Sequence, residues 1–306
     1  MRNKLLFLLI CLLLMATGCK GEPALGSRGV IYAFVGNTDQ THWQQLAWGL
    51  EAFGQEEGLD IRVIELDIEG QERASLKQIK GAIKKSTGAI IIRPFDSDRL
   101  EGLLKSAHKK AIPLIYLEDR PSGQEPPGTL IYTDREKAAK EAGKAMVDLL
   151  EGSGEIAIIG TNNAGDLEDP RETGFIDGIK GHQNVKLVNI YDCRGDSHIA
   201  KQTAIDILSA YPSLGGLYAT CPQAAIGAAE ALAELGINSR VKVLSFGYND
   251  ELLTYINNNR VCGAVTENSY QAGYLAGQAA LSLMKGESIG KDIEAGFNFI
   301  SGESDK

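Results

Sequence analysis

The stretch "IIIRPFDSDRLEGLLKSAHKKAIPLIYLEDR" (residues 90–120) places a longer, charge-rich segment between two apolar runs. The runs "III" and "IPLIYL" are almost continuous in apolar residues, which is typical of strands buried on both faces of a parallel sheet. The segment between them is long enough for the helix that links two parallel strands. This stretch therefore predicts a strand, a helix and a second, parallel strand.

The same alternation extends along most of the chain. The runs "VIYAFVG" and "IRVIEL" come before it, and "EIAIIG", "VKLVNIY", "GGLYAT", "VKVLSF" and "VCGAVT" follow after Asp134. Segments of helical period separate the runs, as in the spacing of Leu76, Ile79 and Ile83. Two such series, in a chain of 306 residues that is 43% hydrophobic, predict an α/β protein with two doubly wound parallel sheets.

The first nineteen residues are expected to be an export signal rather than part of the fold. Arg2 and Lys4 precede an apolar run over residues 5–15, which is short for a membrane-spanning helix. The sequence "ATGC" that follows resembles the lipobox of bacterial lipoproteins, and this resemblance implies that Cys19 is lipidated and becomes the mature N-terminus. A membrane helix is the alternative interpretation of this segment.

Charge and cysteine content exclude several classes of function. Removal of Arg2 and Lys4 with the signal changes the formal net charge from −9 to −11, and such a surface repels nucleic acid. Beyond Cys19, the three remaining cysteines cannot form a complete set of disulfides, and they lack the spacing of a metal site. The acidic stretch "GDLEDP" lacks the spacing of a calcium loop and is expected to be a solvated loop. We therefore expect no nucleic-acid partner, no metal and no cofactor.

A resemblance to a known family rests on an ordered set of motifs over about residues 28–300. The sequence is similar to periplasmic sugar-binding proteins of the ribose type, which share their fold with the ligand-binding cores of LacI-type repressors. The motifs that carry this resemblance are "WQQLAWG" (43–49), "RPFDS" (93–97), "IPLIYLEDR" (112–120), "IYTD" (131–134), "RETGF" (171–175), "AAIGAAEAL" (224–232) and "GAVTENSYQAG" (263–273).

The resemblance implies the type I periplasmic binding protein fold, in which two doubly wound lobes are joined by three crossings and close on a ligand. We expect the crossings near Thr133, Glu267 and Ile293. The first lobe would then contain residues 28–133 plus 267–293, and the second lobe residues 134–266 plus 294–306.

The resemblance also implies a ligand-contacting edge on the first lobe. Trp43 falls where the family places a ring that stacks on a sugar, with His42 at a neighbouring aromatic position and Gln40 at a polar contact. An indole face offers apolar area to the C–H groups of a pyranose. The alternative for Trp43 is packing in the core, which is the commoner place for an aromatic ring.

Charged side chains are expected to bind the hydroxyl groups of the ligand. Asp119 and Arg120 match the family's Asp-Arg pair, in which a carboxylate accepts hydrogen bonds from a sugar and a guanidinium donates them. The alternative is a solvated loop with a local ion pair. Arg171 matches an arginine that reaches across the cleft from the second lobe, and its alternative is an ion pair with Asp169 or Glu172.

Three candidate contacts depart from the family pattern. Cys221 precedes Pro222 where the family has Asn-Asp, and Gly247 stands in place of an aspartate. Glu267 replaces a glutamine at the return crossing. These departures predict a ligand other than simple ribose, such as a modified sugar, a nucleoside or a polyol.

The function that these features predict is capture rather than catalysis. We expect a lipid-anchored solute-binding protein, exported to the cell envelope, that holds a small, uncharged, polyhydroxylated ligand between its lobes. The resemblance implies delivery of this ligand to an ABC-type permease. The alternative is a receptor that reports its ligand to a membrane sensor kinase or chemoreceptor, and an exported hydrolase lacks the residues that its site would need.

Overall fold

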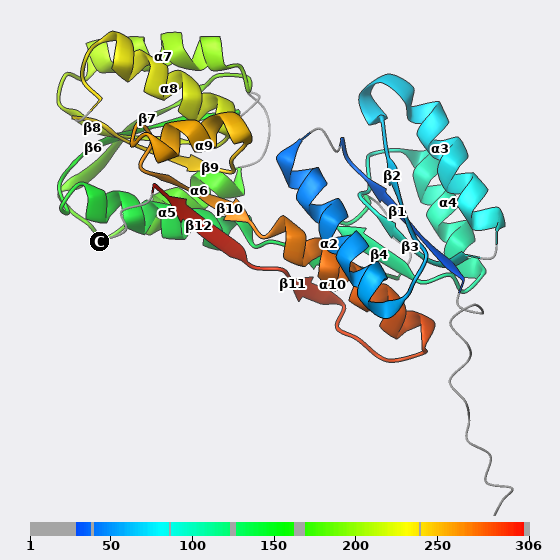
Figure 1. Cartoon of the computed structure of the whole chain (residues 1–306). Helices are drawn as coiled ribbons and strands as arrows, with labels where there is room; N and C mark the ends of the chain where they lie inside the picture. Colours follow the sequence, from blue (N-terminus) through cyan, green and yellow to red (C-terminus); the bar gives the residue numbers. More distant parts are fainter. Residues whose placement is uncertain are drawn as a thin grey trace, which may run out of the picture.

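The computed structural model describes residues 29–37, 40–85, 87–122, 127–161, 169–238 and 240–302. The expected export signal with Cys19, and most of the acidic stretch "GDLEDP", lie outside these residues. The described chain forms two lobes, each with a sheet between helices (Figure 1). Within the described residues, no helix combines the length and apolar character that crossing a membrane would require.

The first lobe contains a six-stranded sheet in which every neighbouring pair is parallel. In spatial order its strands are β11 (Asp292–Glu294), β5 (Thr129–Tyr132), β4 (Leu114–Leu117), β3 (Thr87–Ile92), β1 (Val30–Val35) and β2 (Ile61–Glu65). These strands include the two that the opening stretch predicts, so that prediction is confirmed.

The second lobe repeats this arrangement with one antiparallel strand at its edge. In spatial order its strands are β12 (Phe297–Ser301), β10 (Gly263–Glu267), β9 (Lys242–Phe246), β8 (Leu214–Ala219), β6 (Gly154–Gly160) and β7 (Val185–Asp192). Among the described strands of this sheet, only β12 runs antiparallel to its neighbour, β10.

Helices cover both faces of each sheet, which explains why the strands are apolar throughout. In β1, Ile31 and Ala33 pack under one pair of helices, whereas Tyr32 and Phe34 pack under the other. The first pair is α2 (Thr41–Glu57) and α10 (Ser269–Met284), and the second is α3 (Ile68–Lys84) and α4 (Asp98–Lys109). In the second lobe, α5 (Arg135–Leu149) and α6 (Pro170–Ile179) cover one face, and α7 (Ser197–Ala210), α8 (Pro222–Glu234) and α9 (Asp250–Asn257) cover the other.

The helix α10 returns to the first lobe and packs closely on α2. A Cβ atom at Gly273 would lie 2.0 Å from the carbonyl oxygen of Leu46, and one at Gly49 would lie 2.0 Å from that of Tyr270. These two glycines therefore set how closely the helices approach. The contact brings the first turn of α2 beside the start of α10, where His42 and Ser269 meet.

Three connections link the lobes (Figure 1). The chain leaves the first sheet after β5 to enter α5, and it leaves the second sheet after β10 to enter α10. The third connection, Ala295 and Gly296, joins β11 of the first sheet to β12 of the second. The structure thus places Glu267 at the end of a second-lobe strand and the third connection just beyond Ile293.

Candidate functional site

A cavity of about 840 Å³ lies between the lobes. It opens where the carboxyl ends of the parallel strands in both lobes meet, which is where open α/β sheets bind ligands. Its size falls in the range of about 300–1,000 Å³ that is usual for small-molecule sites. The polar side chains of its lining are those of Gln40, Thr41, His42, Gln45, Arg93, Glu118, Arg135, Thr161, Asp169, Arg171, Thr220, Gln223, Tyr248, Asn249, Thr266, Glu267 and Ser269.

The first lobe supplies its charged residues from a helix start and two strand ends. His42 is the second residue of α2, and Arg93 directly follows β3. Glu118 directly follows β4 and has the left-handed backbone conformation, with a φ of 67°. All three side chains line the cavity.

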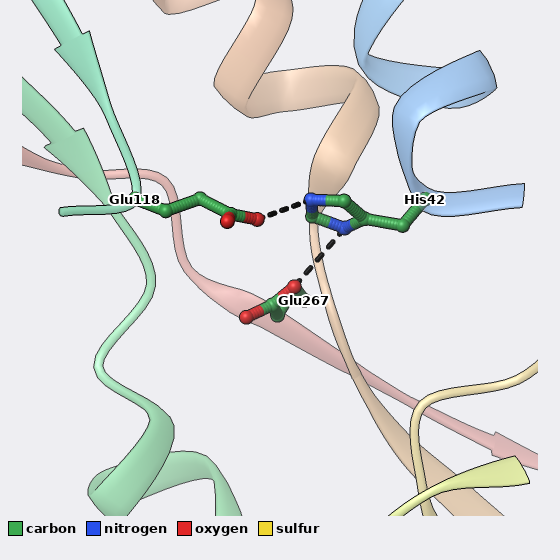
Figure 2. Close-up of side chains that lie close together, drawn as sticks. All are labelled: His42, Glu118 and Glu267. Atoms are coloured by element: carbon green, nitrogen blue, oxygen red, sulfur yellow. Dashed lines mark ion pairs between the residues drawn. The ribbon is translucent and has the colours of Figure 1, made fainter. Parts of the chain in front are cut away.

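His42 lies between two carboxylates, Glu118 and Glu267 (Figure 2). Its Nε2 atom forms an ion pair with Glu118, and its Nδ1 atom lies 3.0 Å from Oε2 of Glu267. The hydroxyl of Ser269 lies 2.8 Å from the same Nδ1 atom. The imidazole is thus held from both sides, and its contact with Glu267 links the first lobe to the last residue of β10.

Arg135, the first residue of α5, completes this cluster from the second lobe. Its Nε atom donates to Oε1 of Glu267 at 2.5 Å, and its Nη2 atom lies 3.4 Å from Oε2 of Glu118. We call His42, Glu118, Arg135 and Glu267 the hinge cluster, because its ion pairs join the lobes beside two of the connections. With His42 protonated, the cluster holds two cations and two carboxylates.

The electrostatics of the hinge cluster favour the charged form of each group whose pKa is shifted. Burial of the imidazole opposes protonation, but hydrogen bonds with Glu118 and Glu267 outweigh burial and raise the pKa of His42 to about 10. Burial of the Glu267 carboxylate raises its pKa. Interactions with His42 and Arg135 lower the pKa by more, so it lies well below the usual range. At neutral pH, His42 therefore carries a positive charge.

The same three residues are of types that ligate metal ions. One atom from each of His42, Glu118 and Glu267 lies within 4.8 Å of the others, and one histidine with two carboxylates is a donor set that zinc accepts. Arg135 contacts both carboxylates, however, and protonated His42 contacts both as well. Because these two cations already neutralise the carboxylates, we interpret the cluster as an ion-pair network.

Trp43 lines the cavity but offers little surface to a ligand. Its side chain is 5% exposed and belongs to the first-lobe core. The indole packs against Gly36, where a Cβ atom would come within 2.4 Å of Nε1. The guanidinium of Arg93 lies over the ring, 5.1 Å from its centroid. In this conformation Trp43 supports Arg93 through a cation–π contact, rather than presenting an open face for a sugar.

Arg171 extends into the cavity from α6 and is paired within its own lobe. Its Nη2 atom lies 2.6 Å from Oδ2 of Asp169, and its Nη1 atom donates to the carbonyl oxygen of Thr220 at 3.0 Å. Asp169 also caps α6 by accepting from the backbone N–H of Arg171 at 2.9 Å. Arg171 is thus held at the cavity wall by its ion pair with Asp169, which is one of the two ion pairs that the sequence offered as an alternative to ligand binding.

Of the two departures in the second lobe, the structure explains Gly247 and shows where Cys221 lies. Gly247 has a φ of 73°, a conformation that favours glycine, so its place in the lining reflects the turn after β9. Cys221 is buried at the N-terminus of α8 and also lines the cavity. A hydrogen bond from the Cys193 thiol outweighs burial and lowers the pKa of Cys221 to about 7, with help from the backbone N–H groups of α8.

A hydrogen bond between Gln45 and Tyr248 also joins the two lobes. The side-chain amide of Gln45, on α2, donates to the hydroxyl of Tyr248, which follows β9. Both residues line the cavity. The two lobes therefore make direct polar contact away from the connections.

Comparison with known proteins identifies the family. The profile described as a periplasmic binding protein domain matches residues 31–288, which is most of the chain. This chain belongs to the periplasmic binding protein domain family. Its two α/β lobes have the type I fold, and its relatives are of the ribose type.

Named relatives of this periplasmic binding protein are themselves binding proteins. The ribose import binding protein RbsB of Bacillus subtilis is 22% identical over 304 residues, covering 96% of this chain and 97% of the relative. The D-allose-binding periplasmic protein of Escherichia coli is 23% identical over 238 residues, covering 76% of each chain. Among solved structures, a sugar-binding protein of a sugar ABC transporter from Bacillus halodurans has a TM-score of 0.80 at 20% identity, covering 90% of this chain and 98% of that one.

The structure places the expected Asp-Arg pair of this periplasmic binding protein outside the cavity lining. Asp119 is exposed, and neither it nor Arg120 lines the cavity. Arg120 instead bonds Oδ1 of Asp292 at 2.5 Å and the carbonyl oxygen of Lys291 at 3.1 Å, which ties the loop after β4 to β11. Glu118, which directly follows β4 in a left-handed backbone conformation, supplies the carboxylate at this strand end instead.

Of the other predicted positions, the structure brings Gln40, His42, Trp43, Arg171, Cys221, Gly247 and Glu267 together in the lining. Sequence reasoning missed Arg93, Glu118 and Arg135 as members of the site. Arg93 and Glu118 share a signal that was available, because each is the first polar residue after a buried parallel strand. Arg135 carries no such signal, since its main partner, Glu267, lies 132 residues away in sequence.

Proposed function

We propose that this protein captures a small polyhydroxylated ligand, a sugar or a close derivative, in the cavity between its lobes. It acts by binding and release rather than by turnover. The observation that carries the proposal is the cavity itself, whose polar side chains come from the strand ends and helix starts of both lobes. Ribose and D-allose, which the names of two relatives give as ligands, are of this chemical class.

The geometry supports a mechanism of closure on the ligand. A sugar that bonds Glu118 or Arg93 in the first lobe and Arg171 in the second makes its full set of contacts only when the lobes are near each other. Such a ligand shifts the population toward the closed form, because it binds that form more tightly. The contact between Gln45 and Tyr248 shows that the two walls can touch in this chain.

Delivery to a membrane partner completes the proposal. The family and the likeness to a sugar ABC transporter component support a permease of the ABC type as the recipient. The predicted export signal and Cys19 support a protein held at the membrane by lipid, which keeps the captured ligand close to the permease.

A thermal-shift screen against sugars, polyols and nucleosides tests the proposal. A ligand that binds only the folded protein raises the unfolding midpoint, and the rise grows with the ratio of the ligand concentration to its Kd. We expect at least one compound to raise it, and Arg171→Ala to abolish that rise while moving the midpoint of the unliganded protein by only a few degrees.

Arg240→Ala is the matched control, because Arg240 is exposed on the second lobe and does not line the cavity. This variant should respond to the same compound as the unaltered protein. Normal binding by Arg171→Ala, or a screen in which no compound raises the midpoint, would contradict the proposed function.

A further inference from the structure

Arg93 differs from the other two arginines of the cavity in its access to a carboxylate. Arg171 has Asp169 at 2.6 Å, and Arg135 has Glu267 at 2.5 Å. The nearest carboxylate oxygen to Arg93 in the described chain belongs to Glu118, and it lies 3.9 Å from Nε. The Arg93 side chain is 41% exposed and lines the cavity, so N–H groups of its guanidinium are available to a ligand.

The shared carboxylate Glu118 cannot fully neutralise Arg93. It also forms ion pairs with His42 and Arg135, both of which approach it more closely than Arg93 does. Within the described residues, three cations around the hinge cluster therefore face two carboxylates, while Arg171 and Asp169 balance each other. The described part of the cavity lining thus carries a surplus positive charge, on a chain whose formal net charge is −9.

The position of Arg93 is fixed as well as charged. Its Cα follows the buried strand β3, and its guanidinium rests on the ring of Trp43, 5.1 Å from the centroid. Trp43 is itself packed in the core. A guanidinium that is placed in advance loses less conformational freedom on binding, and its flat fork matches a carboxylate or phosphate.

We propose that the ligand is an anionic sugar derivative whose carboxylate or phosphate binds Arg93. This inference rests on the proposed function and narrows it, and it departs from the uncharged ligand that the sequence predicts. Closure of the lobes removes water from Arg93, and an unpaired cation is costly to dehydrate. An anionic ligand provides a negative charge beside Arg93 when the lobes close, whereas a neutral sugar provides none.

Binding measurements on matched acid and neutral pairs test the inference. The pairs are D-glucuronate with D-glucose, D-galacturonate with D-galactose, D-gluconate with D-glucitol, and D-ribose 5-phosphate with D-ribose. We expect the acid of at least one pair to bind about tenfold to a hundredfold more tightly than its neutral partner, as measured by titration calorimetry. The first three pairs test a carboxylate, and the fourth tests a phosphate.

Two variants and a control locate the charge that is recognised. Arg93→Gln should reduce the preference for the acid about tenfold or more, and Arg93→Lys should retain part of it, because a lysine keeps the charge without the fork. Arg99→Gln is the control, since Arg99 is an exposed arginine of the same lobe outside the cavity lining. It should leave both affinities unchanged. Raising the salt concentration should weaken binding of the acid more than binding of the neutral sugar.

The outcomes separate this inference from the proposed function. If neutral sugars bind as tightly as their acids, or if Arg93→Gln keeps the full preference for the acid, the inference is wrong and the proposed function stands. If neither member of any pair binds, the inference is wrong, and the proposed function is contradicted as well only when the thermal-shift screen finds no ligand.

Discussion

The first-lobe wall of the cavity and the second-lobe wall are built alike but carry different charges. Each is made from the carboxyl ends of parallel strands and from helix starts. In the described first lobe, the side chains of His42, Arg93 and Glu118 lie close to one another. Two of them also contact Arg135 and Glu267 of the second lobe. The described second lobe contributes two ion pairs, Arg135 with Glu267 inside the hinge cluster and Arg171 with Asp169 outside it. On the proposals made above, the hinge side sets charge selectivity, and the pair of Arg171 and Asp169 completes a grip that depends on closure.

The largest expected effect separates the hinge cluster from the second-lobe pair. Glu267→Gln removes a mostly buried carboxylate that serves both His42 and Arg135, so it should lower the free energy of unfolding by about 3 kcal/mol. Asp169→Asn should lower the free energy of unfolding by only about 1 kcal/mol. Asparagine caps a helix about as effectively as aspartate does, and only one cation, Arg171, loses its ion-pair partner. Urea denaturation of both variants measures the difference. Equal losses would show that the hinge cluster has no special role.

The pH dependence of stability sharpens the same contrast. The pKa of His42 rises from 6.5 in the unfolded chain to about 10 in the folded protein, so the folded state binds more protons across this interval. The contribution is complete below pH 6.5 and is lost as the pH rises toward about 10. Urea midpoints measured from pH 6 to pH 10 should therefore fall.

Two histidine variants identify the source of that slope. In His42→Gln, the urea midpoint should fall much less between pH 6.5 and 10. His182 is at an exposed position of the second lobe, so His182→Gln should show the same fall as the unaltered protein. A slope that survives in His42→Gln would assign the effect to other groups. The lowered pKa of Glu267 affects stability at acidic pH. Its contribution to the free energy of unfolding is lost as the pH falls below the usual range of carboxyl pKa values.

The smallest predicted effect concerns the contact that joins the two walls directly. Tyr248→Phe removes the hydroxyl that accepts from Gln45, which should weaken ligand affinity about fivefold, equivalent to roughly 1 kcal/mol. Tyr255→Phe removes a hydroxyl that contacts Glu230 outside the cavity lining, and it should leave affinity unchanged. Titration calorimetry with the ligand from the screen distinguishes the two. If both variants bind alike, the contact does not contribute to closure.

The fold could be predicted from the sequence because its signals are local. The strands are apolar on both faces, and Asp134 and Asp196 each precede a helix that they cap by accepting from the backbone N–H groups of Lys137 and His198. The site could be predicted only in part. One residue of backbone geometry decides whether Glu118 or Asp119 faces the cavity, and the spacing of "YLEDR" does not reveal it.

Contacts between distant residues account for the rest of what the sequence left open. The link between Arg135 and Glu267 depends on how two of the connections lie side by side. The use of Trp43 as a support for Arg93 likewise depends on the approach of β3 to α2. Each residue type was visible in the sequence, but its partner was set by tertiary structure.

Tryptophan fluorescence tests most directly whether the ligand binds in the cavity between the lobes. The chain has two tryptophans, Trp43 in the cavity lining and Trp48 on α2, which is 52% exposed outside it. In Trp48→Phe, the ligand from the screen should change the emission of Trp43 through the guanidinium of Arg93 that lies over its ring, with the same Kd as calorimetry. A change that persists in Trp43→Phe and is absent from Trp48→Phe would place the ligand elsewhere and contradict the account.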